Sequence, residues 1–358
     1  MRRREWLVGA STLGAVAALD LHSAAPVQPR RPSPDRLPTR IAFGSCAEQD
    51  KPQPIWDAIN ELRPDLFMFL GDNIYGDTRN MNVLRAKYRK LARKPGFRRL
   101  CEQTPVLAIW DDHDYGEDDS GGDYPMKLQS QKIFCDFWSE PADSPRRKRD
   151  GIYDAVLLSD GNRTLQIILP DLRFNRTPLV FSGNGRRGAL GPYAQQTSSQ
   201  ATMLGERQWQ WLEATLREKA DVRIFSSSLQ VVADATGWES WIYFPGDRQR
   251  LLDTIRRERA NGLFCLSGDM HYGELSCLTE NVPYPLWDLT SSGLTEVWNN
   301  RPPNKWRVGD ILPETNFGWI EIDWTSADIG VLLQVRSGLG AVRFEQRITA
   351  RQLSVADA

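Results

Sequence analysis

The chain has 358 residues, of which 41% are hydrophobic and 25% are charged, and this is the composition of a globular protein. Its 45 basic and 46 acidic residues give a formal net charge of −1. This balance offers no overall charge to attract nucleic acid or an anionic membrane, and no nucleic-acid-binding module is evident. The spacing of the cysteines does not indicate a small disulfide-stapled scaffold. The cysteines are Cys46, Cys101, Cys135, Cys265 and Cys277.

Residues 1–25 have the layout of an export signal. Arg2, Arg3 and Arg4 precede an apolar, small-residue run that continues to Leu19. Two consecutive arginines before an aromatic residue and a leucine indicate the type that the twin-arginine translocase reads. An ordinary secretory signal with a basic start is the alternative. We therefore expect an exported protein, periplasmic or extracellular, and the run is too short for a stable membrane anchor.

Residues 26–39 differ from the rest because they contain five prolines and no apolar periodicity. This composition predicts an extended linker behind the signal. From residue 40 to residue 358 there is no internal repeat and no second linker of this kind. We predict a single domain over residues 40–358, which is large for one hydrophobic core.

Within the domain, short apolar runs alternate with segments of helical periodicity. Buried strands are expected at 41–43, 66–70, 106–109, 165–169, 224–227 and 263–266. Helices are expected at 53–63, 82–93, 127–138, 206–220 and 248–260. A hairpin around residues 160–162 and an antiparallel pair at 319–324 and 331–335 argue against a purely parallel sheet. The pattern predicts the α/β class, with mixed sheets in a sandwich.

Four of the expected strands run directly into polar clusters at their C-terminal ends, the edge where open α/β sheets bind ligands. Converging carboxylates repel one another unless a cation neutralises them. Carboxylate, imidazole, phenol and thiolate groups are all metal ligands. These clusters therefore predict a metal site. They are IAFGSC (41–46), LFMFLGDNIYGD (66–77), VLAIWDDHDYGEDD (106–119) and LFCLSGDMHYGE (263–274).

Histidine is scarce in this chain, and its positions support the same site. His22 lies in the predicted signal, whereas His113 and His271 each follow an expected buried strand, within WDDHD and GDMH. A lone histidine is often an ordinary core or surface residue. Two histidines in this setting favour a functional role for both.

The segments GSC, GDNIY, WDDHDYG and SGDMHYGE, in this order, resemble the alkaline phosphatase D (PhoD-like) family of calcineurin-like metallophosphoesterases. Matching segments at DLR (171–173), SSLQ (227–230), TSSG (290–293) and NFG (316–318) extend the resemblance over most of the domain. The resemblance implies a four-layer sandwich of two mixed β-sheets flanked by helices, with the metals at the strand ends.

The resemblance also implies a role for each residue that matches a family ligand. Asp72 matches the aspartate that bridges two metal ions. Cys46, Tyr75 and His271 would complete the site of an iron(III) ion. Asp269 would bind the second ion, which is typically calcium in the family. Another divalent metal in place of iron or calcium is the alternative.

One position departs from the family pattern. Relatives often read WDDHDYG-x-N-D with an asparagine ligand, and this chain has Asp118 at that position. Aspartate can also ligate, and its additional negative charge favours a hard dication such as Ca²⁺. The alternative is an altered metal preference or a weaker activity.

The catalytic residues that the resemblance implies are His113, Asp112 and Arg173. His113 would face the leaving group, and Asp111 and Asp112 would orient it or contribute ligands, or either would cap the following turn. Arg173 would clamp the phosphate with both arms of its guanidinium. Arg176 is the alternative clamp, and a surface salt bridge is the alternative for both arginines.

The predicted function is that of an exported metal-dependent phosphoester hydrolase in which a metal-bound hydroxide attacks a phosphate monoester or diester. Phosphodiesterase or phospholipase D-like activity at the same site is the first alternative. A metal-stabilised binding protein without catalysis is the second.

Overall fold

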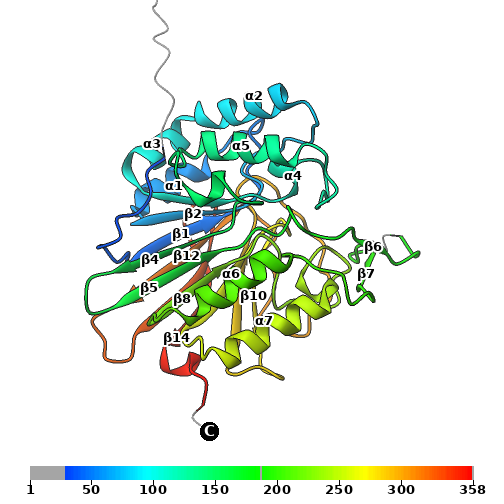
Figure 1. The fold of residues 1–358 in the computed structure, drawn as a ribbon. Coiled ribbons are helices and arrows are strands. Elements are labelled where there is room, and N and C mark those ends of the chain that lie inside the picture. The colour runs from blue at the N-terminus through cyan, green and yellow to red at the C-terminus, as the bar shows by residue number, and fades with distance from the viewer. Residues whose placement is uncertain (1–28, 186–187, 357–358) are drawn as a thin grey trace, which may run out of the picture.

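The structure is a computed structural model that describes residues 29–185 and 188–356, and the predicted export signal lies outside the described residues. Two six-stranded mixed sheets form the centre of the molecule. Helices lie over both sheets, α1 to α5 on one side and α6 and α7 on the other (Figure 1). The predicted four-layer α/β sandwich of two mixed sheets is confirmed.

The first sheet has the strand order β14-β13-β12-β1-β2-β3. Strands β1, β2 and β3 are parallel neighbours, and β12, β13 and β14 extend the sheet by antiparallel pairing. The strands are β1 (Arg40–Gly44), β2 (Leu66–Leu70), β3 (Val106–Ile109), β12 (Asn316–Asp323), β13 (Gly330–Ser337) and β14 (Val342–Thr349). The helices beside it are α1 (Ile55–Leu62), α2 (Met81–Ala92), α3 (Pro95–Gln103), α4 (Asp112–Tyr115) and α5 (Lys127–Phe137).

The second sheet has the order β10-β11-β9-β8-β5-β4, with β5, β8, β9 and β11 parallel. Its strands are β4 (Asp154–Ser159), β5 (Thr164–Leu169), β8 (Val222–Ser226), β9 (Leu263–Ser267), β10 (Gly273–Leu278) and β11 (Leu286–Ser291). The remaining elements are α6 (Glu206–Arg217), α7 (Pro245–Arg257), the ribbon of β6 (Val180–Phe181) and β7 (Tyr193–Ala194), and 3-10 turns at Pro145–Arg147, Trp241–Tyr243 and Arg351–Leu353. Among the described residues, no helix has the length and apolar character needed to cross a membrane.

All six predicted buried strands and all five predicted helices are present, and so are both antiparallel pairs. The sequence did not predict α3, which begins with Pro95-Gly96, a pair typical of turns. Strands β10 and β11 were also missed, because polar residues interrupt their apolar pattern. Each of these strands is fixed by its neighbours in the sheet and not by its own periodicity.

The described part of the predicted linker, residues 29–39, lies against the domain. The Val106 amide at the start of β3 donates to the carbonyl of Arg30 over 2.8 Å. The Ser159 amide at the end of β4 donates to the carbonyl of Pro34, also over 2.8 Å. Since β3 and β4 are the edge strands of the two sheets, this segment ties the sheets together along their common side.

The pairing of β1 with β12 generates a prediction about stability. Gly318 lies opposite Phe43, and a Cβ at residue 318 would approach the Phe43 ring to 2.0 Å. Overfilling a packed core costs about 1–3 kcal/mol, so Gly318→Ala should lower the free energy of unfolding by that amount in urea titrations. Gly330→Ala is the control, because its Cβ would meet only Asp323, at 4.0 Å. Equal stability of the two variants would show that the contact with Phe43 imposes no constraint.

Candidate metal centre

The C-terminal ends of β1, β2 and β3 of the first sheet meet the C-terminal end of β9 of the second sheet. Four residues that follow these strands have backbone φ angles in the left-handed region: Cys46 (63°), Asp72 (48°), Asp269 (71°) and His271 (58°). This conformation costs a residue other than glycine about 1–3 kcal/mol, and it persists where the surroundings impose it. All four residues were predicted from the sequence as metal ligands. Of the eleven non-glycine residues with positive φ among the described residues, four are therefore predicted ligands.

The first cluster joins side chains from both sheets. The ligand atoms of Cys46, Asp72 and His271 all lie within 4.8 Å of one another. The Cys46 thiol donates to Oδ2 of Asp72 over 3.4 Å, and the Tyr75 hydroxyl lies 3.0 Å from Nε2 of His271. Burial lowers the pKa of His271 to about 4, so the imidazole is neutral, which is the form that binds a metal. The structure thus brings together the four residues that the sequence assigned to the first ion.

A second cluster is built around the carboxylate of Asp112, which belongs to three groups of possible ligands. Asp112 was predicted as a catalytic residue or a ligand, and its central position favours a ligand. Predicted ligands Asp118 and Asp269 each lie within reach of it. The three groups are Asp72-Asp112-His113, Asp111-Asp112-Asp269 and Asp112-Asp118-Asp119, each with its ligand atoms within 4.8 Å of one another.

Asp119 is a candidate ligand that the sequence did not single out. Its amide donates to Oδ2 of Asp112 over 2.7 Å, and its carboxylate accepts a hydrogen bond from the Tyr193 hydroxyl. Burial and the like charges of Glu239 and Asp112 raise the pKa of Asp119 to about 9. Asp118, by contrast, is exposed. The family pattern pointed to Asp118, and nothing in the sequence indicated its neighbour Asp119.

The buried carboxylates of the two clusters fit a cation. Burial raises the pKa of Asp72 and of Asp269 above the usual range, and repulsion from Asp111 and Asp112 acts in the same direction. One buried oxygen each of Asp72, Asp111 and Asp112 has no hydrogen-bond partner among the described residues. An unpartnered buried polar atom costs about 1–3 kcal/mol, more when charged, and a metal ion would remove this cost.

His113 stands beside the clusters and is held from two sides. Its Nδ1 lies 2.7 Å from Oδ1 of Asp77, and its ring stacks on Tyr75 with centroids 4.2 Å apart. Burial alone would lower the pKa of His113, but the carboxylates of Asp112, Asp72 and Asp77 raise it to about 12. Asp77, the last residue of GDNIYGD, was not singled out from the sequence. It fixes the orientation of the imidazole.

Arg173 occupies a different place from the one predicted. Its side chain is fully buried, and it does not line the cavity above the clusters. Nε donates to Asp111 over 2.6 Å, one terminal nitrogen donates to Glu239 over 2.7 Å, and the other lies 3.5 Å from Asp112. Arg176 is also buried and lies 3.2 Å from Glu239. This geometry argues against the predicted phosphate clamp and favours a guanidinium that orients the carboxylates.

The segments DLR, SSLQ, TSSG and NFG match the family but contain no candidate metal ligand. Each uses buried side chains to form hydrogen bonds with another of the matching segments, so the segments constitute one connected polar network. The bonds are Trp110 Nε1 to Asp171 (2.9 Å), Ser228 Oγ to Asp111 (2.7 Å), Gln230 Nε2 to Glu274 (2.6 Å) and to Thr290 (3.0 Å), and Ser291 Oγ to Asn316 (2.7 Å).

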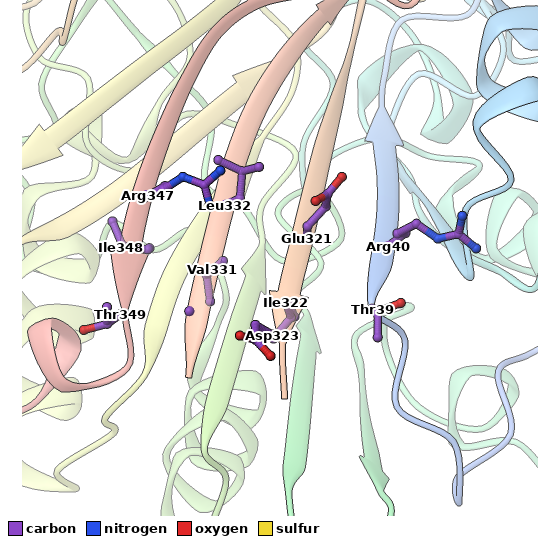
Figure 2. A pocket seen from close by; sticks show the side chains of 11 residues that line it. Thr39, Arg40, Glu321, Ile322, Asp323, Val331, Leu332, Arg347, Ile348 and Thr349 are labelled. Atoms are coloured by element: carbon purple, nitrogen blue, oxygen red, sulfur yellow. The ribbon is translucent and has the colours of Figure 1, made fainter. Parts of the chain in front are cut away.

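A cavity of about 430 Å³ lies above the clusters. A hollow of about 490 Å³ runs along β1, β12, β13 and β14, where Figure 2 shows Arg40, Glu321 and Arg347. Arg40 begins β1, whereas the clusters follow the end of that strand, so the hollow in Figure 2 lies away from them. It contains none of the predicted site residues. The chemistry therefore belongs to the cavity above the clusters.

The fold is similar to that of metal-dependent phosphatases. The structure resembles PhoD, with a TM-score of 0.67 and 15% identity over 90% of this chain and 69% of PhoD. It also resembles a dimetal phosphatase from Danio rerio (TM-score 0.52, 14% identity, 89% of this chain and 100% of that one). A third similar structure is GAP50, the anchor in the inner membrane complex of Plasmodium (TM-score 0.55, 12% identity, 90% of each chain). At these identities the likeness shows the calcineurin-like fold.

A comparison of the sequence with family profiles matches part of the chain to one family. Residues 158–300 match the profile of the PhoD-like phosphatases, whereas no curated protein matches the chain. The predicted resemblance to this family is confirmed, and with it the class of the protein, a metal-dependent phosphoesterase.

The position of His113 generates a prediction about catalysis. His113→Ala should lower kcat by about 10²–10⁴-fold, the range for a positioned acid, with the metal content per chain unchanged. Asp77→Asn should cause a smaller loss and shift the pH profile of kcat, because the imidazole keeps its place but loses its charged partner. Glu117→Gln, which removes an exposed carboxylate of the same loop, is the control. Loss of metal from His113→Ala would instead place His113 among the ligands.

Proposed function

We propose that the protein is an exported hydrolase of phosphate monoesters or diesters that uses two metal ions. The observation that carries this proposal is the set of overlapping carboxylate groups around Asp112 and Asp72, several of which line an open cavity together with His113. Metal ions bound there would neutralise the phosphate charge and lower the pKa of water. A structural metal site is usually closed by four ligands, and the excess of polar groups argues against the binding-protein alternative.

The two clusters differ in chemistry, which supports two different metals. Cys46, Tyr75, His271 and Asp72 offer one thiol, one phenol, one imidazole and one carboxylate. This mixed set suits iron(III). The cluster around Asp112 offers carboxylates alone, which suit a hard dication such as calcium. These assignments agree with the metals that the family resemblance implies.

Other residues of the chain donate the proton and position the carboxylates. His113, with Nδ1 bound to Asp77, keeps Nε2 as the atom that gives a proton to the leaving oxygen. Arg173 and Glu239 form a buried ion pair that fixes Asp111 in one orientation. The Arg173 guanidinium also offsets part of the repulsion among the carboxylates. No covalent phosphoenzyme is required, so no serine is assigned as a nucleophile.

The function is tested with purified protein in which the bound metal is measured. Turnover is measured on mono-substituted and bis-substituted phosphate esters, which separates monoesterase from diesterase activity. Asp72→Asn should abolish turnover and lower the metal per chain, because Asp72 lies in the groups of both clusters. Asp143→Asn, at an exposed position, is the control. Full metal content without turnover on any ester would favour the binding protein.

The identity of the first metal has a spectroscopic test. If Tyr75 binds iron(III) as phenolate, charge transfer should colour the purified enzyme, and Tyr75→Phe should remove or shift the visible band. Zinc would suit the thiol and the imidazole but would give no such band. The measurement is a visible spectrum beside iron analysis. An active wild-type enzyme that is colourless and free of iron would contradict the assignment.

Export through the twin-arginine route is the last part of the proposal. It rests on Arg3 and Arg4 before an apolar run, in a segment outside the described residues. All five cysteines of the chain are free, which suits folding and metal loading in a reducing compartment before export. Replacing both arginines with lysine should leave the folded precursor in the cytoplasm, as judged by cell fractionation. Unchanged export of that variant would exclude this route.

A further inference from the structure

The cavity above the clusters has two unlike walls. One wall is polar and carries the candidate metal ligands together with His113. The apolar wall is formed by Trp238, Met270 and Trp298, which pack with the buried Tyr272 and Ile311 in a small hydrophobic cluster. This apolar wall has no role in the binding of phosphate or metal ions, because both are polar. Its half-buried side chains are available to another part of a bound molecule.

The two tryptophans form a fixed corner. Their ring centroids lie 5.2 Å apart at an interplanar angle of 88°, and the Trp298 ring also stacks over Tyr272 at 6.5 Å and 15°. The Trp298 amide donates to the carbonyl of His271 over 2.9 Å, which ties this ring to a candidate ligand. The indole nitrogen of Trp238 donates to the carbonyl of Ala189 over 3.0 Å. The corner is therefore held in place before any ligand arrives.

We propose that Trp298 and Trp238 bind the organic group of the phosphoester, and that this group carries an aromatic ring close to the phosphate. The inference rests on the proposed function and names the substrate class for the same site. Both tryptophans are only half-buried although they line the cavity, so apolar surface stays available beside the metal clusters. Perpendicular indoles can stack one face of a planar ring and contact its edge, the two arrangements that aromatic pairs prefer.

A hydrophilic organic group fits this wall poorly. The hydroxyl groups of a sugar or glycerol phosphate need hydrogen-bond partners when they leave water. Trp238, Met270 and Trp298 supply apolar surface there, and Asn300 at the rim is exposed. The cavity of about 430 Å³ falls within the range of small-molecule sites, about 300–1,000 Å³. Phosphate at the metal ligands and an aromatic ring at the apolar wall would both be accommodated.

The test measures binding directly and does not depend on turnover. Calorimetry of the metal-loaded protein compares phenylphosphonate, methylphosphonate and inorganic phosphate. Stacking of one ring on an aromatic side chain corresponds to about a 5- to 150-fold change in affinity. The wild type should prefer phenylphosphonate over methylphosphonate within that range. Trp298→Ala should remove most of this preference, and Trp298→Phe should retain most of it.

Trp324→Ala, which truncates a partly buried tryptophan beyond the end of β12, is the matched control. It should leave the preference unchanged. A preference that survives Trp298→Ala would overturn the proposal, and so would a wild type that binds all three anions without discrimination. An equal loss of all three anions in Trp298→Ala would also overturn it, because Trp298 would then only support His271. If none of the anions binds to the wild type, both this inference and the proposed function fail.

Discussion

The mutual repulsion of buried carboxylates is the constraint on which the rest of this structure depends. Asp72, Asp111, Asp112 and Asp269 meet where two sheets end, and burial makes their charge still more costly. The protein itself provides two positive charges against this repulsion, the fully buried guanidinium of Arg173 and the imidazolium of His113, whose pKa the carboxylates raise to about 12. Two positive charges cannot balance four carboxylates. The remaining imbalance, with its unpartnered oxygens, is what makes this edge of the sandwich a site for cations.

The sandwich can hold such a cluster because parallel strands deliver side chains to one edge. Strands β1, β2 and β3 come from one sheet and β9 from the other, so neither sheet alone contains the site. Cys46, Asp72, Asp269 and His271 then adopt left-handed backbone conformations just after the strand ends. The conformational free energy that this costs must be offset by interactions of the surrounding network. That network consists of hydrogen bonds between buried side chains such as Ser228 and Asp111, and such networks are rigid when they are satisfied.

The sequence predicted the parts of the fold and site that local patterns encode. Apolar runs ending in polar clusters placed Cys46, Asp72 and His271 correctly beside one another, because strand ends of an α/β sheet share an edge. The role of Arg173 was beyond such reasoning. A sequence shows that an arginine follows a strand, but whether it points into the cavity or behind the carboxylates depends on Glu239, 66 residues along the chain. Strand β10 was missed for a similar reason, since its neighbours and not its composition make it a strand.

The departure from the family pattern at Asp118 is physically reasonable once the loop is seen in three dimensions. An additional negative charge is least costly where water can solvate it, and Asp118 is the exposed member of its cluster. The neighbouring Asp119 is oriented by two contacts, through its amide to Asp112 and through its carboxylate to Tyr193 of the β7 ribbon. The protein therefore fixes one aspartate of the pair and leaves the other at the rim. Partial burial and the charge of Asp112 raise the pKa of Asp118, so the extra carboxylate adds to the repulsion in the cluster and to its attraction for a hard cation.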